Sequence, residues 1–562
     1  MKSDKKRVSV TALQGTVVVS LFALGTFHEY LSALLSAALF ALLLIRFRRE
    51  GRVMFRPSPV NLILLGFPFL YLLTSLWAAD KGMALMGFVK FLPVSLFTLL
   101  LSDREEERNG LLDLLPWAGA VQTALSAGLT QLPALAGWFS VSGRLAGFFQ
   151  YPNTFALLLL LGILVLLTKE KLSVPDYVCL AALVGGVLYS GSRTTAVLTV
   201  VFAAAAVFTG KNKKVKWTAL IAVAVLIAGA GIYAALSGNY RTVGRFLSIS
   251  LSESTFLGRL LYWKDGLRLF ARHPFGLGYM GWHFLQYPNQ TGVYTVQFIH
   301  NDFLQILLDV GALGFGLFAF ALAAAFFAKG TDRRRRLMLL AFGGHLLMDF
   351  DLQFVSMFLL LAALLYTPGE REWELTKKAA LAAPCAALTV FSLWIGASQG
   401  LYHFKRYKAA ALVYPGNTLA LMGVMGQTED PAAAAKTADR IVERNPYVAD
   451  AWGVKAAAAF SEGDIPAMDE YKQKQLDNAP YRIESYDEYC YMLAVAFNLY
   501  QKQNNPAGMK FCRDRLLAVP ERLAALEQKT DPLALRIDDK PSFDLSGDSQ
   551  SLLSQIRTAT EE

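Results

Sequence analysis

The chain has 562 residues, of which 54% are hydrophobic and only 17% charged, and its formal net charge is +10 at pH 7. Length alone would indicate three or four soluble domains. The composition excludes that class, because nearly uncharged stretches of about 16 to 25 residues recur and are long enough for helices to cross a bilayer. Four cysteines are too few for a disulfide framework, although whether Cys490 and Cys512 pair is open, and no zinc motif is present.

The uncharged stretches predict an all-α, polytopic membrane protein with about 13 transmembrane helices. The first follows a basic segment without a convincing small-residue cleavage site, so we expect an uncleaved span rather than a signal peptide. The fifth is the weakest, because it carries Asp113, Pro116 and Gln122. The candidate spans lie near residues 8–26, 30–45, 58–78, 82–101, 111–130, 153–168, 174–190, 194–209, 217–236, 302–328, 335–349, 351–366 and 379–397.

Basic residues are distributed unevenly between the expected loops. If the N-terminus is cytoplasmic, the inside loops are rich in Lys and Arg, whereas the short outside turns hold almost none beyond Lys81, Arg144 and Arg193. Most of the net positive charge is therefore explained by the basic residues of the inside loops, which set the membrane orientation. We expect no nucleic-acid partner. The inside loops on this threading are 1–7, 46–56, 102–110, 169–173, 210–216, 329–336 and 367–378.

Two segments are expected outside the membrane: an extracytoplasmic loop at 237–301 and a tail that begins near residue 398. The tail is Ala-rich, with charges spaced along apolar faces, as is typical of soluble helices. Asn445-Pro446-Tyr447 is followed 34 residues later by Ala479-Pro480-Tyr481, a spacing that indicates tetratricopeptide-like helix pairs; a generic helical bundle is the alternative. The predicted domains are a transmembrane region at 1–397, a tetratricopeptide-like region at 398–535 and a loosely ordered tail at 536–562.

Ionisable residues are costly near a membrane, so the arginines beside the expected outer turns are candidate functional residues. Arg144 precedes a Pro-Asn pair that opens a helix, Arg193 occupies a short turn, and Arg259 lies in the long loop. Each alone could be a solvated or snorkelling side chain. Together they would suit a diphosphate, because guanidinium groups bind phosphate oxygens in bidentate geometry and would stabilise a departing diphosphate without a metal. Spacing does not rank Arg259 above its neighbours Arg241, Arg245, Arg268 and Arg272.

His300 stands where the long loop re-enters the membrane, with Asn301-Asp302 expected to cap the next helix. Imidazole titrates near neutral pH, which suits a general base that deprotonates a sugar hydroxyl; a purely structural histidine is the alternative. His345 and Asp349 are four residues apart, so we expect a structural pair on one helix face, with a proton relay as the alternative. Asp349 and Asp351 are expected in a polar turn.

Four motifs occur together in a particular order along the chain. They are Gly-Arg-Leu-Ala-Gly-Phe-Phe-Gln-Tyr-Pro-Asn at 143–153, Ser-Gly-Ser-Arg at 190–193, Gly-Arg-Leu-Leu-Tyr-Trp with His-Pro-Phe-Gly-Leu-Gly-Tyr within 258–279, and His-Asn-Asp-Phe-Leu-Gln-Ile-Leu-Leu-Asp-Val-Gly-Ala-Leu-Gly at 300–314. Because these four motifs occur in this order, the chain resembles the O-antigen ligase and O-antigen polymerase superfamily of bacterial membrane glycosyltransferases. The resemblance is strongest over about 140–320.

The resemblance implies a metal-independent, inverting enzyme that needs no cofactor and works at the outer face of the bacterial cytoplasmic membrane. It would transfer a glycan from a polyprenyl diphosphate carrier to an acceptor hydroxyl on a glycan, lipid or protein. By the same resemblance, Arg144, Arg193 and Arg259 would bind the donor diphosphate and His300 would act on the acceptor. The repeat-like tail would be extracytoplasmic and could bind the acceptor or a protein partner.

Two alternatives to a ligase stay open. A polymerase that joins lipid-linked repeat units also needs residues that bind the diphosphate and a base that activates the hydroxyl. The sequence therefore does not separate the two reactions. The second alternative is a solute or bicarbonate transporter, which is not an enzyme of this kind. It is less favoured, because a transporter should place polar groups near the bilayer midplane, and here most of them gather at the expected outer interface.

Overall fold

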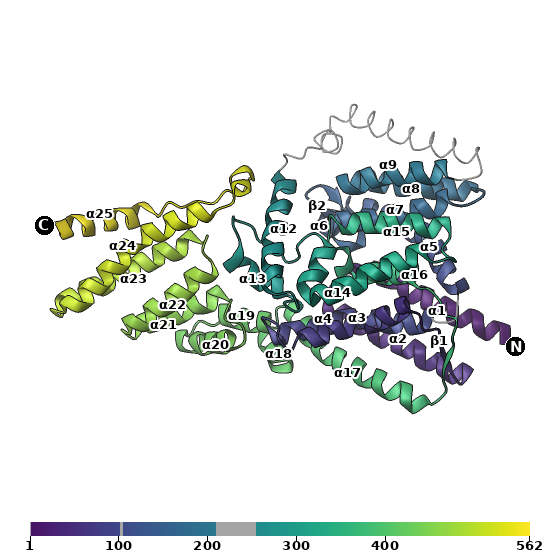
Figure 1. The fold of residues 1–562 in the computed structure, drawn as a ribbon, viewed down its shortest axis with the longest axis horizontal. Helices are drawn as coiled ribbons and strands as arrows, with labels where there is room; N and C mark the ends of the chain where they lie inside the picture. Colours follow the sequence, from purple (N-terminus) through teal and green to yellow (C-terminus); the bar gives the residue numbers. More distant parts are fainter. Residues whose placement is uncertain (1, 102–104, 210–253, 562) are drawn as a thin grey trace. The chain divides into compact units, whose positions relative to one another are not determined.

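The computed structural model describes residues 2–101, 105–209 and 254–561 (Figure 1), and within these the chain is built almost entirely of helices. The expected span at 217–236, Arg241 and Arg245 lie outside the described residues. The chain divides into two compact units. The first comprises the described parts of Met1–Leu76, Ala84–Ser250 and Phe298–Gly400, and the second those of Trp77–Met83, Leu251–Gln297 and Leu401–Glu562.

The first unit is a bundle of apolar helices, and each expected span in the described residues coincides with one of them. The bundle's core is formed by α7 (Pro152–Leu167) and α16 (Val355–Leu365), whose leucines are buried on every side. Helices α8, α9 and α15 pack with α7 (Figure 1). The helices are α1 (Lys2–Phe22), α2 (Glu29–Glu50), α3 (Pro59–Thr74), α4 (Lys81–Leu101), α5 (Glu105–Leu129), α6 (Pro133–Phe139), α7, α8 (Val174–Ser190), α9 (Arg193–Phe208), α14 (Asp302–Phe327), α15 (Arg333–Leu346), α16 and α17 (Lys378–His403).

Four of the described helices, α2, α4, α14 and α17, are long and apolar enough to cross a membrane. Six further apolar segments are shorter, at 10 to 17 residues; they lie within α1 and at α3, α7, α8, α9 and α16. The structure therefore supports a multi-pass membrane protein, while the count of about 13 spans stays a prediction.

Loops that the threading assigns to the same inner side do contact one another. Strand β1 (Val53–Phe55) pairs antiparallel with β4 (Trp373–Leu375), which joins the loops at 46–56 and 367–378. Arg335, from the loop at 329–336, donates to the carbonyl of Tyr366 over 2.6 Å, and Arg108 donates to the same carbonyl over 3.2 Å. These contacts are compatible with the expected alternation of loops, and both that alternation and the cytoplasmic face stay predictions.

The second unit contains α12 (Ser254–Arg272), α13 (Gly281–Asn289) and the helices of the tail, in which consecutive helices pack on each other (Figure 1). Several tail helices begin in the same way, with an Asp or Asn side chain accepting from a backbone N–H and a proline within the first turn, as at Asp430, Asp464 and Asn505. These helices are α18 (Tyr407–Val413), α19 (Thr418–Gly426), α20 (Pro431–Arg444), α21 (Ala449–Ser461), α22 (Ile465–Asn478), α23 (Ile483–Lys502), α24 (Pro506–Lys529) and α25 (Gly547–Glu561).

The apolar core of the tail settles one open question and changes one expectation. Cys490 and Cys512 are both buried in it as free thiols, and burial raises the pKa of these thiols to about 12 and about 11. Where a loosely ordered segment is expected at 536–562, the structure has α25, with Leu553 buried in this core and Leu552 and Ile556 packed against it. The three apolar residues recur at helical spacing within a stretch whose overall composition is polar.

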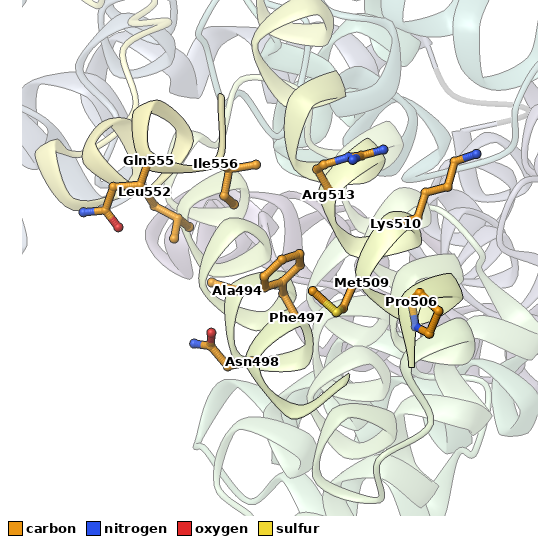
Figure 2. A pocket seen from close by; sticks show the side chains of 10 residues that line it. All are labelled: Ala494, Phe497, Asn498, Pro506, Met509, Lys510, Arg513, Leu552, Gln555 and Ile556. Atoms are coloured by element: carbon orange, nitrogen blue, oxygen red, sulfur yellow. The ribbon is translucent and has the colours of Figure 1, made fainter. Parts of the chain in front are cut away.

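A pocket of about 470 Å³ opens between α23, α24 and α25 (Figure 2). Phe497 of α23 and Met509 of α24 point toward each other in it, and Ile556 of α25 adds a third apolar side chain. Lys510 and Arg513 project from one side of α24, so the pocket combines an apolar lining with two cationic side chains.

Candidate functional site

Arg144 is held between two motifs that are far apart in the sequence. It lies in the short strand β3 (Arg144–Leu145), which pairs with β2 (Ser140–Val141). Its Nε donates to the carbonyl of Ser190 over 2.8 Å, and its Nη2 donates to Oδ1 of Asn153 over 2.6 Å. The guanidinium is therefore oriented by the end of α8 on one side and the start of α7 on the other.

The segment between Arg144 and Asn153 follows a backbone path that needs unusual residues. Gly147 has φ +60°, and a Cβ there would lie 2.4 Å from the ring of Phe155. Gln150 adopts the left-handed conformation at φ +55°, which is uncommon for a residue with a side chain. Pro152 then starts α7, so Asn153 lies in its first turn. This path brings Asn153 back to the guanidinium of Arg144.

Asn153 and Tyr151 both bind the carboxylate of Asp349. Nδ2 of Asn153 donates to one oxygen over 2.6 Å, and the hydroxyl of Tyr151 donates to the other over 2.7 Å. Asp349 is almost fully buried, so these bonds offset the cost of removing its carboxylate from water. The Tyr151 ring also lies 4.7 Å from the ring of Phe350.

His300 joins this group through Phe350, whose ring it meets edge-on at 4.9 Å between centroids. The backbone of His300 is left-handed, at φ +51°, and Nδ1 lies 3.0 Å from the carbonyl oxygen of Phe298. A carbonyl only accepts, so Nδ1 carries the proton, and the acceptor lone pair of the neutral ring is on Nε2. That is the tautomer in which Nε2 acts as a base. The expected cap is confirmed, since the side chain of Asn301 accepts from the N–H of Leu304 over 3.0 Å.

Arg193 is the first residue of α9 and is half-buried. The turn before it, Ser190-Gly191-Ser192, is the one whose Ser190 carbonyl accepts from Arg144, so one turn organises both arginines. Gly191 makes the turn possible with its left-handed backbone at φ +59°. Three predicted site residues, Arg144, Arg193 and His300, thus belong to the first unit; contacts connect Arg144 with the turn before Arg193 and, through Asp349 and Phe350, with His300.

A buried polar chain fixes the first turn of α9, the helix that begins at Arg193. Thr195 binds Nε2 of His345 over 2.9 Å, and Nδ1 of His345 lies 2.5 Å from the carboxylate of Asp351. The hydroxyl of Thr154 donates to the other oxygen of Asp351 over 2.6 Å. The predicted pair of His345 with Asp349 on one helix face is wrong, because α15 ends at Leu346 and Asp349 lies beyond its last turn. Asp349 and Asp351 do lie in the expected polar turn after α15, and both are buried and hydrogen-bonded there.

Arg259 lies near the start of α12 in the second unit and is half-buried. Among its basic neighbours, Arg268 forms an ion pair with Asp265 at 3.1 Å, and Arg272 donates to Asn289 over 3.2 Å. Asp265 also accepts from Thr291 and Tyr294, and burial raises its pKa even though these bonds oppose the shift. Arg268 and Arg272 thus have structural contacts within the second unit.

One buried cation, close to Phe298, was not predicted from the sequence. The side chain of Lys90, in α4, is fully buried; its Nζ donates to the carbonyl of Phe27 over 2.9 Å and lies 3.6 Å from Glu29. The ammonium also faces the rings of Phe27 and Phe298, at 4.7 and 5.3 Å from their centroids. A lysine in the middle of an otherwise apolar span was the available signal.

Within the described ranges, no group of three or more His, Cys, Asp or Glu side chains could hold a metal ion.

The fold is that of an all-helical, multi-pass membrane protein, and Arg193 and His300 lie at the starts of two of its helices. Residues 178–319 match the family model described as O-antigen ligase. The matched segment includes Arg193, Arg259 and His300, and Arg144 precedes it. The match supports the O-antigen ligase superfamily, and it indicates a glycosyl-transferring enzyme with a ligase or polymerase role in surface glycan biosynthesis. No curated protein matches the chain.

Proposed function

We propose that the protein transfers a glycan from a polyprenyl diphosphate carrier to an acceptor hydroxyl at the outer face of the bacterial cytoplasmic membrane. The observation that carries this proposal is the hydrogen-bonded path from Arg144 through Asn153 to Asp349, which leads through the Phe350 ring to His300. It supports a single site in which Arg144 would bind the diphosphate and His300 would act as the general base. The family match of residues 178–319 supports the same chemistry.

In the proposed reaction, Nε2 of His300 takes the proton of the acceptor hydroxyl. The acceptor oxygen then bonds to the anomeric carbon on the face opposite the carrier, so the configuration inverts. The bond from that carbon to the carrier oxygen breaks, and its electron pair leaves with the polyprenyl diphosphate. Nδ1 donates to the carbonyl of Phe298, which keeps the imidazole in the tautomer that this step needs.

Arg144 and Arg193 would neutralise the diphosphate as it departs. Guanidinium groups stay charged at any working pH and bind phosphate oxygens in pairs, so they can perform the charge stabilisation that a metal performs in other enzymes. Because Arg144 is already held by Ser190 and Asn153, little reorganisation is needed when the donor binds. By the resemblance alone, Arg259 is a third proposed donor-binding residue, and the proposed reaction uses no metal or other cofactor.

The tail beyond residue 398 would be extracytoplasmic and would present tetratricopeptide-like helix pairs to an acceptor or a protein partner. The pocket between α23, α24 and α25 supports a binding role, because apolar side chains and two cations line the same opening. A ligand with an apolar group beside a negative charge would match it.

The test is transfer by the purified full chain from a lipid-linked donor. Release of the diphosphate carrier together with a product that contains both glycan and acceptor would support the proposal, and a wild-type protein without transfer would contradict it. Ligase and polymerase separate in a deletion strain. Long lipid-linked chains accumulate when a ligase is lost, and single repeat units accumulate when a polymerase is lost.

A further inference from the structure

The segment that carries His300 is anchored by side chains from two helices of the first unit. The backbone N–H of Ile299 donates to Oε1 of Gln305 over 3.0 Å. The other end of the same amide, Nε2 of Gln305, donates to Oδ1 of Asp309 over 2.8 Å. The hydroxyl of Tyr71, from α3, donates to Oδ2 of Asp309 over 3.3 Å. Together they form a continuous chain from α3, through α14, to the residue before His300.

The chemistry of the partners sets the direction of these bonds. A backbone N–H only donates, so the oxygen of the Gln305 amide must face Ile299, and its nitrogen is then directed at the carboxylate of Asp309. Gln305, Asp309 and Tyr71 each have no more than 1% of their surface exposed. Buried polar groups of this kind are costly unless they are paired, so the arrangement has few alternatives.

His300 needs such an anchor because its own backbone is unfavourable. The left-handed region at φ +51° is uncommon for a residue with a side chain. A strained backbone of this kind persists only where the surrounding contacts hold it. The bond from Nδ1 of His300 to the carbonyl of Phe298 depends on the backbone of all three residues from 298 to 300. A shift at Ile299 would therefore move the imidazole and change its tautomer preference together.

We infer that Gln305, held by Asp309 and Tyr71, is a positioning residue that keeps His300 in the geometry and tautomer required for proton removal from the acceptor. The inference rests on the proposed function, and it assigns roles to three residues that do not touch the reacting atoms. Asp309 and Lys90, although ionisable and buried within spans, thereby have contacts that lead to residues 298–300.

Gln305→Met keeps the size of the side chain and removes both hydrogen bonds. We expect a loss of about 10-fold to 100-fold in the rate of the transfer step, the effect of misplacing a catalytic group by about an ångström, with the KM for the donor little changed. Tyr71→Phe removes a single oxygen and should cause a smaller loss in the same rate. Gln122→Met is the matched control, because Gln122 is a buried glutamine of α5 whose Nε2 donates to the carbonyl of Leu21; its rate should stay at the wild-type level.

The deciding readout is a double-mutant cycle with His300→Ala. If Gln305 acts through His300, Gln305→Met should change the residual rate of the His300→Ala protein by less than about 2-fold. A loss of equal size in both backgrounds would show a merely structural role and overturn the inference. Wild-type protein without transfer would instead contradict the proposed function. Should Gln305→Met not fold, Tyr71→Phe in both backgrounds decides the question in the same way.

Discussion

The side-chain amide of Asn153 donates a hydrogen bond of 2.6 Å to the carboxylate of Asp349, across 196 positions of sequence. Because the oxygen of the same amide accepts from Arg144, a neutral side chain separates a cation from a buried anion. A direct ion pair would engage the guanidinium with the carboxylate, whereas in the proposed site the charge of Arg144 would act on the donor phosphates. The link between Arg144 and Asp349 can therefore be tested by exchanging the amide of Asn153 with the carboxylate of Asp349.

Asn153→Asp should reduce donor affinity by about 10-fold or more, because a second carboxylate would repel Asp349 and bind Arg144 directly. The donor KM of the purified protein measures this. The double variant Asn153→Asp with Asp349→Asn keeps the number of charges and restores a donor opposite a carboxylate, so it should recover part of the loss. Equal defects in the single and double variants would count against the proposed link.

Transfer should continue in excess chelator, since arginines are expected to provide the charge neutralisation that a metal supplies elsewhere. The experiment uses purified protein, lipid-linked donor and acceptor, with and without a divalent-metal chelator. Activity that disappears with chelator and returns with magnesium would overturn metal independence.

The long loop at 237–301 and the tail should lie on the same, non-cytoplasmic side. The described native cysteines Cys179, Cys385, Cys490 and Cys512 are buried, so labelling of an introduced cysteine should have a low background. Ser461→Cys, on the exposed end of α21, should react with an impermeant reagent in whole cells, whereas Lys377→Cys, in an expected inside loop, should react only after permeabilisation. If both positions reacted only after permeabilisation, the span count would be wrong by one, and the reverse pattern would show that the assigned orientation is wrong.

The second unit should lose stability as the pH falls below 6.5, because of His283 in α13. Burial lowers the pKa of this histidine to about 4, so between pH 6.5 and 4 the unfolded chain binds a proton that the folded chain does not. His283 should therefore cost about 2 kcal/mol of stability between pH 7 and pH 5. Hydrogen exchange of α13 measures it as lost protection, and His283→Asn should abolish that part of the loss. An unchanged pH dependence in the variant would refute the assignment.

Much of the helical framework could be predicted from apolar periodicity. The span expected at 174–190 coincides with α8, and the cap at Asn301 was predicted from residue type alone. Helix ends were less predictable: α15 stops at Leu346, before Asp349, and Nδ1 of His345 contacts Asp351.

The candidate site could be predicted as a set of residues but not as an arrangement. The ordered motifs pointed to Arg144, Arg193, Arg259 and His300, of which all but Arg259 belong to the first unit. Local spacing carries no signal for a contact such as Asn153 with Asp349, because it depends on how α7 packs against the chain that follows α15. The left-handed backbone of His300 could not be predicted from its residue type either, because the surrounding contacts impose it.

The most direct test of the central claim is the single-turnover rate of glycan transfer by His300→Ala, measured at saturating lipid-linked donor beside Arg193→Lys and the exposed-lysine control Lys81→Ala. We predict that His300→Ala binds donor as the wild type does but transfers about 100-fold to 10,000-fold more slowly, the usual contribution of a general base. Arg193→Lys should weaken donor binding and transfer together, because the planar guanidinium is lost. If His300→Ala transferred glycan as fast as the wild type and Lys81→Ala, His300 would not be the base and the proposed site would be contradicted.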